Sequence, residues 1–390
     1  MPPARASAAV DAPRASGAVL VVGAGVAGLS AALELAELGC RVVLTDASPA
    51  IGGLLARLDR QFPSDHCGMC RLLPDIGREE AAQLCLRKGL FHERIEVLPA
   101  TRVEAVHGEP GAFAVQLVGE PRFVDPARCT GCGDRCAEVC PVEVPDDFSG
   151  WPAARRKAIH RPVPHALPNV HRIIAEFCTR CGQCAAICPA GAIDLQAAPV
   201  QRTVRAEAIV LAAGLGLFDP AADPAMERFL VSPNVVTALQ LERLLGGRGR
   251  RPGPLRRPSD GRPVRRVAWL QCVGSRAAKQ GRDHCSSVCC MFALKEAVLA
   301  RQQCGPELEA TIFAMDLRTY GKGHHRYRVR AEQEHGVRIV RCRPHEVVAL
   351  ADGSLRVRFA DPATGELGQQ TFDLVVLSTG QAAPRPDAAL

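Results

Sequence analysis

AVLVVGAGVAGLSAALELAELGCRVVLTD, residues 18–46, is the stretch that decides the fold of this chain. Its first apolar run is typical of a buried parallel strand and leads into the glycine pattern Gly23-x-Gly25-x-x-Gly28. A helical stretch follows, and a second apolar run ends in Asp46. This order of strand, glycine loop, helix, strand and acidic residue is the full context of a dinucleotide-binding fingerprint.

The cofactor that we predict for this fingerprint is FAD. The glycines let the backbone approach a diphosphate at the helix N-terminus, and Asp46 is placed to hold a ribose hydroxyl. Gly52 and Gly53 follow soon after, in a pattern that resembles FAD-binding disulfide reductases more than simple NAD dehydrogenases. The alternative interpretation is a glycine-rich turn without a ligand.

Two later apolar runs end in glycine: 208–214 ends in Gly214 and 373–380 ends in Gly380. They resemble the strands by which the chain of those flavoproteins leaves and re-enters the FAD domain. We therefore expect a discontinuous FAD domain, with both glycines at the cofactor.

A second α/β unit is predicted between about 264 and 361. Strands are expected at 266–270, 310–314, 337–340, 346–350 and 354–359, with a helix over 288–302. Reductases that use NAD(P)H carry a second glycine pattern after the first of these strands. Here the loop reads QCVGSR, 271–276, so direct use of NAD(P)H is not expected.

Composition narrows the function classes. The 390 residues are enough for two or three domains, and 47% hydrophobic with 23% charged residues is typical of a globular protein. The net charge of +7 is spread along the chain and aromatic residues make up only 4%, which argues against nucleic-acid binding. Residues 1–17 are predicted to be a disordered tail, and no export signal or membrane span is recognised, so a cytoplasmic location is expected.

Eighteen cysteines in such a chain indicate metal binding rather than disulfides. Cys178-x2-Cys181-x2-Cys184-x3-Cys188-Pro189 is the bacterial ferredoxin run, and an upstream run has the same spacing with one extra residue, most simply Arg135. The fourth cysteine of each run is expected to serve the other cluster. The predicted ligands are Cys129, Cys132, Cys136 and Cys188 for one [4Fe-4S] cluster, and Cys178, Cys181, Cys184 and Cys140 for the other. A zinc site is the alternative.

With these motifs the chain resembles a known family, HdrA, the A-type subunit of heterodisulfide reductase, including the related flavoprotein subunit of quinone-interacting membrane oxidoreductase complexes. The resemblance runs from about residue 18 to 381. It rests on the segments GAGVAGLSAALELA, CTGCGDRCAEVCPVEVPDDF, RKAIHRPVPHALPNV, CTRCGQCAAICPAGAID, QCVGSR, CSSVCCMFALKEA and DLRTYGKG.

The resemblance implies a third cluster in the second unit, with the ligands Cys272, Cys285, Cys289 and Cys290. From the residues alone, Cys272 follows a strand and the adjacent pair begins a helix, where ligands and thiolates are favoured. Cysteines that only pack in the core are the alternative. Cys67 and Cys70 also match the family, and three roles stay open for them: a redox disulfide near the flavin, ligands facing a partner, or structural thiols.

The chain also departs from the family. Asp46 stands where the family usually has Glu, and the predicted loop 322–325 has histidines where an aromatic and an acidic residue are commoner. The further ferredoxin domain of longer relatives is not expected after Gly380.

The predicted function is electron transfer in a heterodisulfide-reductase-like or quinone-interacting complex, with FAD splitting or relaying electron pairs into clusters. Partner subunits and an electron-donor protein (a hydrogenase, dehydrogenase or ferredoxin) are implied. The alternatives are an NAD(P)H-dependent oxidoreductase resembling the small subunit of glutamate synthase, and a scaffold that cofactors only stabilise. The predicted division of the chain is a tail (1–17), an FAD domain (18–123, 200–262 with a linker, and a return segment, 362–390), an inserted ferredoxin domain (124–199) and a second Rossmann-like domain (263–361).

Overall fold

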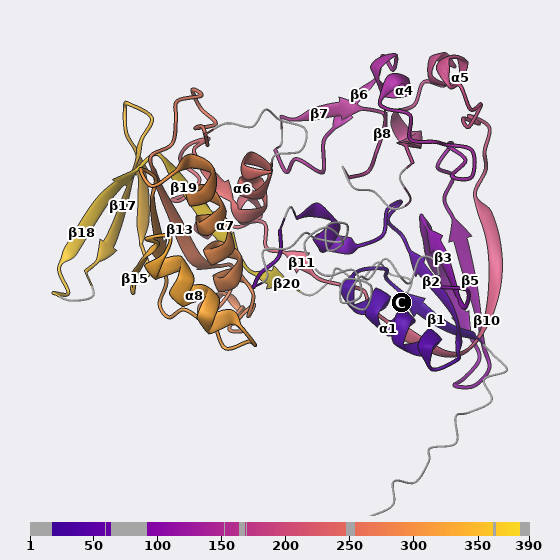
Figure 1. The fold of residues 1–390 in the computed structure, drawn as a ribbon, viewed down its shortest axis with the longest axis horizontal. Coiled ribbons are helices and arrows are strands. Elements are labelled where there is room, and N and C mark those ends of the chain that lie inside the picture. The colour runs from indigo at the N-terminus through magenta and orange to yellow at the C-terminus, as the bar shows by residue number, and fades with distance from the viewer. Residues whose placement is uncertain are drawn as a thin grey trace, which may run out of the picture.

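The computed structural model describes residues 18–58, 60–63, 92–151, 153–163, 168, 170–246, 254–361 and 364–382. The predictions for residues 1–17 and for Cys67 and Cys70 lie outside these residues. Figure 1 shows a first unit with α1, β1 and β10, a second unit with β13, β19 and α7, and an inserted part with α4 and α5 beside the first unit. Within the described residues, no helix has both the length and the apolar character needed to cross a membrane.

The first unit is a six-stranded sheet in the order β3-β2-β1-β10-β5-β4. The first four of these strands are parallel, and β10 then pairs antiparallel with β5, which pairs antiparallel with β4. Helix α1 (Val26–Glu37) packs its small residues on one face. The strands are β1 (Ala18–Val22), β2 (Arg41–Asp46), β3 (Ile95–Pro99), β4 (Thr101–His107), β5 (Phe113–Gly119) and β10 (Val200–Leu211), and η1 (Gly53–Arg57) follows β2.

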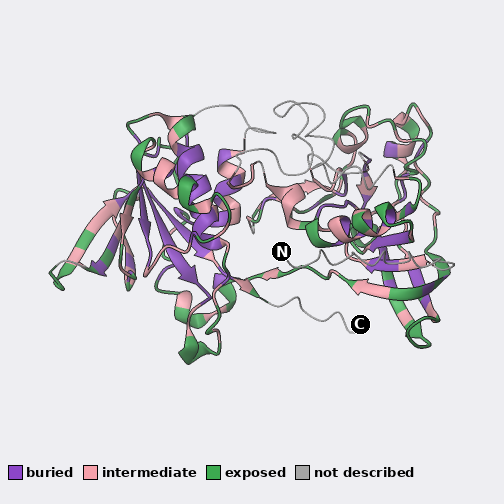
Figure 2. Ribbon diagram, turned by 60° about the horizontal axis from the view of Figure 1, so that its bottom comes forward, coloured by how far each residue is buried: buried purple, intermediate pink, exposed green. Residues whose placement is uncertain are grey.

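The second unit is a five-stranded parallel sheet in the order β12-β19-β13-β14-β15, covered on both faces. Along β13, Val267 and Trp269 pack among the helices, whereas Ala268 and Leu270 face a three-stranded antiparallel sheet. This alternation along one apolar strand produces two cores. Figure 2 shows the buried strands between these layers. The elements are β12 (Val235–Thr237), α6 (Ala238–Leu245), β13 (Arg266–Val273), η6 (Ala278–Gln280), α7 (Cys289–Cys304), β14 (Glu309–Phe313), α8 (His324–Gln333), β15 (Arg338–Val340), β16 (Glu346–Ala349), β17 (Leu355–Ala360), β18 (Leu367–Phe372) and β19 (Leu374–Thr379).

The predicted return of segment 373–380 into the first unit was wrong. Strand β19 lies between β12 and β13 in the second sheet, and β12 and α6, predicted within the first unit, also belong to the second. An apolar run that ends in a small residue identifies a buried parallel strand but does not say which sheet it joins. The connection between the units is instead the antiparallel pair of β11 (Gly216–Leu217) and β20 (Gln381–Ala382), and η4 (Pro220–Ala222) and η5 (Pro224–Met226) follow β11.

The inserted part has little regular structure. It contains two short antiparallel pairs and two short helices around a core that includes six of its cysteines. A bridge between Val124 and Ile193 joins its two ends. The elements are α4 (Arg135–Glu138), β6 (Glu143–Pro145), β7 (Arg155–Lys157), β8 (Ile159–His160), β9 (Arg172–Ile173), η3 (Ala175–Phe177) and α5 (Gln183–Ile187).

Three ionisable side chains are fully buried where α6, α7 and β13 meet. Lys295 forms an ion pair with Glu242, and Glu296 accepts a hydrogen bond from the Trp269 indole at 3.0 Å. Burial raises the pKa of Glu296 well above its ordinary value of 4.5, although the charge of Lys295 acts in the opposite direction. Glu296 therefore keeps a proton in the folded state that the unfolded chain releases.

We expect the Glu296→Gln substitution to remove a pH dependence of stability. Above pH 4.5 the unfolded state binds fewer protons than the folded state, so wild-type stability falls as the pH rises towards the raised pKa of the folded state. Glutamine keeps an oxygen for Trp269 and does not titrate. Thermal unfolding midpoints at pH 5.5 and pH 8.5 should differ less in the variant than in the wild type. Glu309→Gln, at an exposed position of β14, is the control, and an equal difference in the Glu296 variant would contradict the prediction.

Candidate functional site

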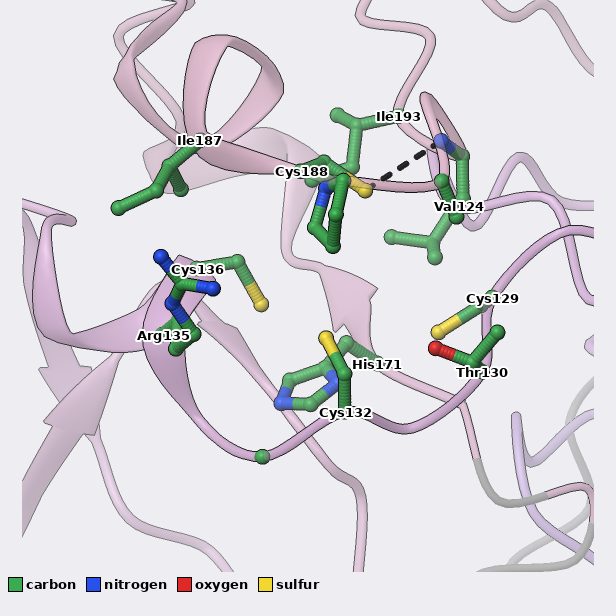
Figure 3. Close-up of a pocket in the computed structure, with 14 residues that line it drawn as sticks. Val124, Cys129, Thr130, Cys132, Arg135, Cys136, His171, Ile187, Cys188 and Ile193 are labelled. Atoms are coloured by element: carbon green, nitrogen blue, oxygen red, sulfur yellow. Dashed lines mark hydrogen bonds between the residues drawn. The ribbon is translucent and has the colours of Figure 1, made fainter.

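Four of the predicted ligands surround one pocket of the inserted part. Its lining includes Cys129, Cys132 and Cys136 of the first run together with Cys188, the last cysteine of the second run. Figure 3 shows these four sulfur atoms pointing into a common space, with apolar side chains around them. The amide of Ala192 donates to the Cys188 sulfur at 3.4 Å. The structure therefore brings together the crossed set that the spacing predicted.

The other four cysteines surround a second pocket. It is lined by Cys178, Cys181 and Cys184 of the second run and by Cys140 from the end of the first. The two pockets hold about 420 and 330 Å³. These volumes are about ten times the 30 Å³ that one water molecule takes up, so each pocket has room for a polyatomic group. Among the residues that the structure describes, no three His, Cys, Asp or Glu side chains are arranged to hold a single metal ion.

The raised pKa values of the thiols in these pockets show that thiolates there need a positively charged partner. Burial raises the pKa of Cys136 to about 11, and the neighbouring thiols Cys129 and Cys132 act in the same direction. Burial likewise raises the pKa of Cys184. Four thiolates cannot share an apolar pocket without a compensating positive charge, and iron supplies that charge. The chemistry of the donor set therefore fits [4Fe-4S] clusters.

The longer loop of the first run is anchored by residues that the sequence did not single out. Its extra residue, Arg135, begins α4, and Asp134 directly before it accepts hydrogen bonds from His171 at 3.0 Å and Arg161 at 3.2 Å. The imidazole of His171 is buried and lies beside Cys132 in Figure 3. Burial lowers its pKa, and the hydrogen bond with Asp134 partly offsets this shift.

The third predicted set gathers at the carboxyl end of β13. Cys272 is buried there with a positive φ of 61°, and Cys289 and Cys290 begin α7. The two adjacent thiols are hydrogen bonded to each other, and this bond, with the backbone N–H of Arg318, lowers the pKa of Cys290. Cys285 is the least buried of the four, and its sulfur accepts from the Ser287 amide at 3.4 Å.

The glycine loop of the first unit is packed as the fingerprint requires. A side chain at Gly23 would overlap the carbonyl oxygen of Ala212, just after β10, and one at Gly53 would lie 3.2 Å from the Cα of Gly25. The carboxylate of Asp46 accepts from the Ala24 amide at 2.6 Å and from the Ser48 amide at 2.7 Å. Burial raises its pKa, and these two bonds act against the shift.

The remaining predicted FAD residues come from three different segments of the chain. Gly52 has a φ of 109° and donates its amide to the Ala24 carbonyl at 2.7 Å, so it lies against the glycine loop. Gly214 follows β10. Gly380 lies in the second unit, where its amide donates to Val273 at 2.7 Å and a Cβ would be 2.9 Å from Ser275. It is therefore next to the third cysteine set.

The loop after β13, which lacks a second glycine pattern, is covered by an aromatic side chain. A Cβ at Gly274 would overlap the ring of Phe218, so this ring covers the loop. The guanidinium of Arg282 lies over the same ring, 4.7 Å from its centroid.

Comparison with known proteins agrees with this geometry. Residues 128–193 match the family model of a 4Fe-4S dicluster domain, and residues 21–69 match that of an NAD(P)-binding Rossmann-like domain. The A-type iron-sulfur subunit of CoB–CoM heterodisulfide reductase from Methanocaldococcus jannaschii is 40% identical over 369 residues, which are 94% of this chain and 54% of the relative. The A-type subunit of H2:CoB-CoM heterodisulfide, ferredoxin reductase from Methanothermobacter marburgensis is 35% identical over 94% of this chain and 53% of the relative.

The chain is a homologue of HdrA. It spans about half the length of the curated relatives that it matches. Thioredoxin reductase of T. acidophilum has a TM-score of 0.43 at 14% identity, covering 94% of this chain and 77% of that structure, a likeness too distant to carry an argument. The predicted α/β class, with a Rossmann-like unit and an inserted dicluster domain, is confirmed.

Three segments that carry the resemblance to HdrA meet at the third cysteine set. Arg276 of QCVGSR contacts the Cys272 thiol and pairs with Asp316, which begins DLRTYGKG. Arg318 of the same segment pairs with Asp316 at 3.4 Å. The sequence alone assigned no role to these charged residues. Only the strand order, which places the ends of β13 and β14 side by side, reveals them as neighbours of the cysteines.

The histidines of segment 322–325 lie in a helix rather than in the predicted loop. His324 is the first residue of α8, not a loop residue, and its ring packs edge-on against Phe62 at 5.7 Å. Phe62 also packs against the helical core of the second unit. This histidine therefore joins the first segment of the HdrA homologue to its second unit.

Proposed function

We propose that this chain is an oxidoreductase subunit that binds FAD in its first unit and three [4Fe-4S] clusters, and relays electrons to or from partner subunits. FAD exchanges electrons singly or in pairs and each cluster carries one, so a chain that holds both joins two-electron to one-electron chemistry. Two clusters would be held by the inserted part. The third would be held by Cys272, Cys285, Cys289 and Cys290.

The observation that carries the proposal is the pair of sulfur-lined pockets. Each contains three thiols of one run and the fourth thiol of the other. This interleaving is the arrangement of two-cluster ferredoxins, which are electron carriers. The same chain has a glycine loop whose close backbone packing fits a dinucleotide.

The chain's own residues have defined roles in this proposal. Val124, Ile187 and Ile193 exclude water from the first cluster, and Ile159 and Ile173 do so at the second. At the third set, the guanidinium of Arg276 offsets part of the negative charge of the thiolates, and the backbone N–H of Arg318 donates to Cys290. Asp316 pairs with both arginine side chains. The glycine loop and the α1 N-terminus form one side of the site for the diphosphate of FAD.

The proposal about partners and substrate rests on the named relatives and not on residues of this chain. The matched relatives are named as heterodisulfide and ferredoxin reductase subunits. We propose that this chain assembles in a complex of that kind, with a disulfide, a sulfur compound or a quinone reduced on another subunit. The electron donor would be a hydrogenase, a dehydrogenase or a ferredoxin.

The first test is the content of iron, sulfide and FAD per chain after anaerobic purification. About twelve iron atoms per FAD are expected for three clusters. About eight would mean that only the inserted part is loaded and would contradict the third cluster.

Rapid mixing with a chemical reductant should then show bleaching of the flavin and of the clusters at linked rates. Reduced flavin that never reoxidises into the clusters would contradict the relay, and bleaching by NADPH without any partner would favour the nicotinamide alternative.

A further inference from the structure

A third pocket lies between the first unit and the inserted part, away from both sulfur-lined pockets. One wall is the segment after β2, which includes Ser48, Gly53 and Arg57. The other wall comes from the inserted part and includes Phe148, Arg156 and Arg172. Its volume is about 480 Å³.

The pocket concentrates positive charge. Arg57, Arg156 and Arg172 all line it, whereas Asp147 is the one acidic side chain among the lining residues that the structure describes. The side chain of Asp147 is 71% exposed, so water screens much of its charge. The guanidinium of Arg156 pairs with Asp147 and lies 3.8 Å from Asp146, and it is itself only 13% exposed.

Several guanidinium nitrogens at or near this pocket are buried and have no hydrogen-bond partner among the described residues. They are Nε of Arg57, Nε of Arg156 and Nη2 of Arg122, which lies close to Arg172. Burial lowers the pKa of Arg156. The charges of Asp147 and Asp146 act against this shift, and those of Arg172 and Arg57 act with it. Burying N–H donors of like charge without partners costs free energy, and an anion with several oxygens removes that cost.

The position of the pocket narrows the class of anion. Gly53 on its wall packs against Gly25 of the glycine loop, where the fingerprint expects a diphosphate. Ser48, Pro49 and Ala50 begin two residues after Asp46, the expected ribose ligand at the end of β2. Planar guanidinium groups bind phosphate oxygens in pairs, which suits a diphosphate.

We propose that this pocket binds the diphosphate-bearing part of a nucleotide, and that the inserted part contributes Arg156 and Arg172 to the site. The inference rests on the proposed FAD site and extends it, because the cluster-bearing insert then closes over the nucleotide. Binding would hold the insert against the first unit. The nucleotide is either the resident FAD or a second nucleotide, and the two sources share the same diphosphate chemistry.

The test uses the full chain, loaded with clusters and depleted of flavin. FAD and riboflavin are titrated separately by flavin fluorescence with wild type, Arg156→Gln and Arg172→Gln. Each variant is expected to bind FAD about ten-fold more weakly, with riboflavin affinity unchanged because riboflavin has no diphosphate. Arg155→Gln is the matched control, since Arg155 is exposed on the same strand, β7, and does not line the pocket. Equal iron content in all variants shows that the insert has folded.

A second titration separates the two sources. FAD-loaded wild type is titrated with ADP, and loss of ADP binding in the arginine variants with FAD affinity unchanged assigns the pocket to a second nucleotide. The proposal is overturned if FAD and ADP both bind the variants as they bind wild type, or if riboflavin binding falls as much as FAD binding. A wild-type chain that binds no FAD contradicts the proposed function, and an ADP titration of the flavin-free wild type and arginine variants then decides the pocket.

Discussion

Cys188→Ala is expected to remove the cluster that is otherwise held by the first cysteine run, although Cys188 belongs to the second. The sulfur of Cys188 lines the pocket of Cys129, Cys132 and Cys136, whereas Cys140 lines the other pocket. Loss of one of four thiolate ligands removes about four iron atoms, one cluster. Iron and sulfide content with electron paramagnetic resonance of the reduced protein measures this.

Double variants decide which cluster is lost. If the ligand sets cross, Cys136→Ala added to Cys188→Ala removes no further iron, because both residues serve one cluster. Cys184→Ala added to Cys188→Ala then removes about eight iron atoms in total. The opposite pattern would show that each run binds its own cluster. Cys40→Ala, at a thiol beside β2 and outside all three cysteine sets, should keep the wild-type iron content.

The sulfur pockets could be predicted from the sequence because the spacing rule is local. Three cysteines within seven or eight residues lie on one loop that surrounds a cluster. The Cys-Pro that follows supplies the fourth cysteine of the run, which serves the other cluster. The support around these pockets could not be predicted. His171 contacts Asp134 across 37 positions of sequence, and the order of the short strands that surround His171 follows from tertiary packing rather than from any repeat.

The error at β19 has a similar origin. The apolar strands β10 and β19 both end close to small residues, so their sequences look alike. The two strands differ in the strands that they pair with: β10 pairs with β1, and β19 pairs with β12 and β13. Pairing is a long-range property that hydrophobic periodicity does not encode. Gly380 follows β19 and lies beside the third cysteine set, and its contact with FAD stays a prediction.

Gly28→Ala is expected to abolish tight FAD binding while the clusters stay loaded. A Cβ at this position would overlap the carbonyl oxygen of Gly23 and lie 2.9 Å from its carbonyl carbon, and it would also come within 3.3 Å of Ala212. The closest of these are backbone atoms of the loop that α1 must approach, so they cannot move aside as a flexible side chain would. Overpacking of this kind costs about 3 kcal/mol, which is about 100-fold in affinity if it falls on the bound state.

Gly39→Ala is the matched control, because it follows the same helix α1 and has nothing within 4 Å of its Cβ position. Its φ of 94° makes alanine cost about 1 kcal/mol in backbone strain, which affects folding but not the nucleotide loop. FAD titration of the two cluster-loaded variants compares them directly. Wild-type FAD affinity in Gly28→Ala would show that the dinucleotide does not bind at this loop. Equal loss in both variants would mean that the effect comes from destabilising the first unit as a whole. A loss confined to Gly28→Ala, with iron unchanged, assigns FAD to the close contact between the glycine loop and α1.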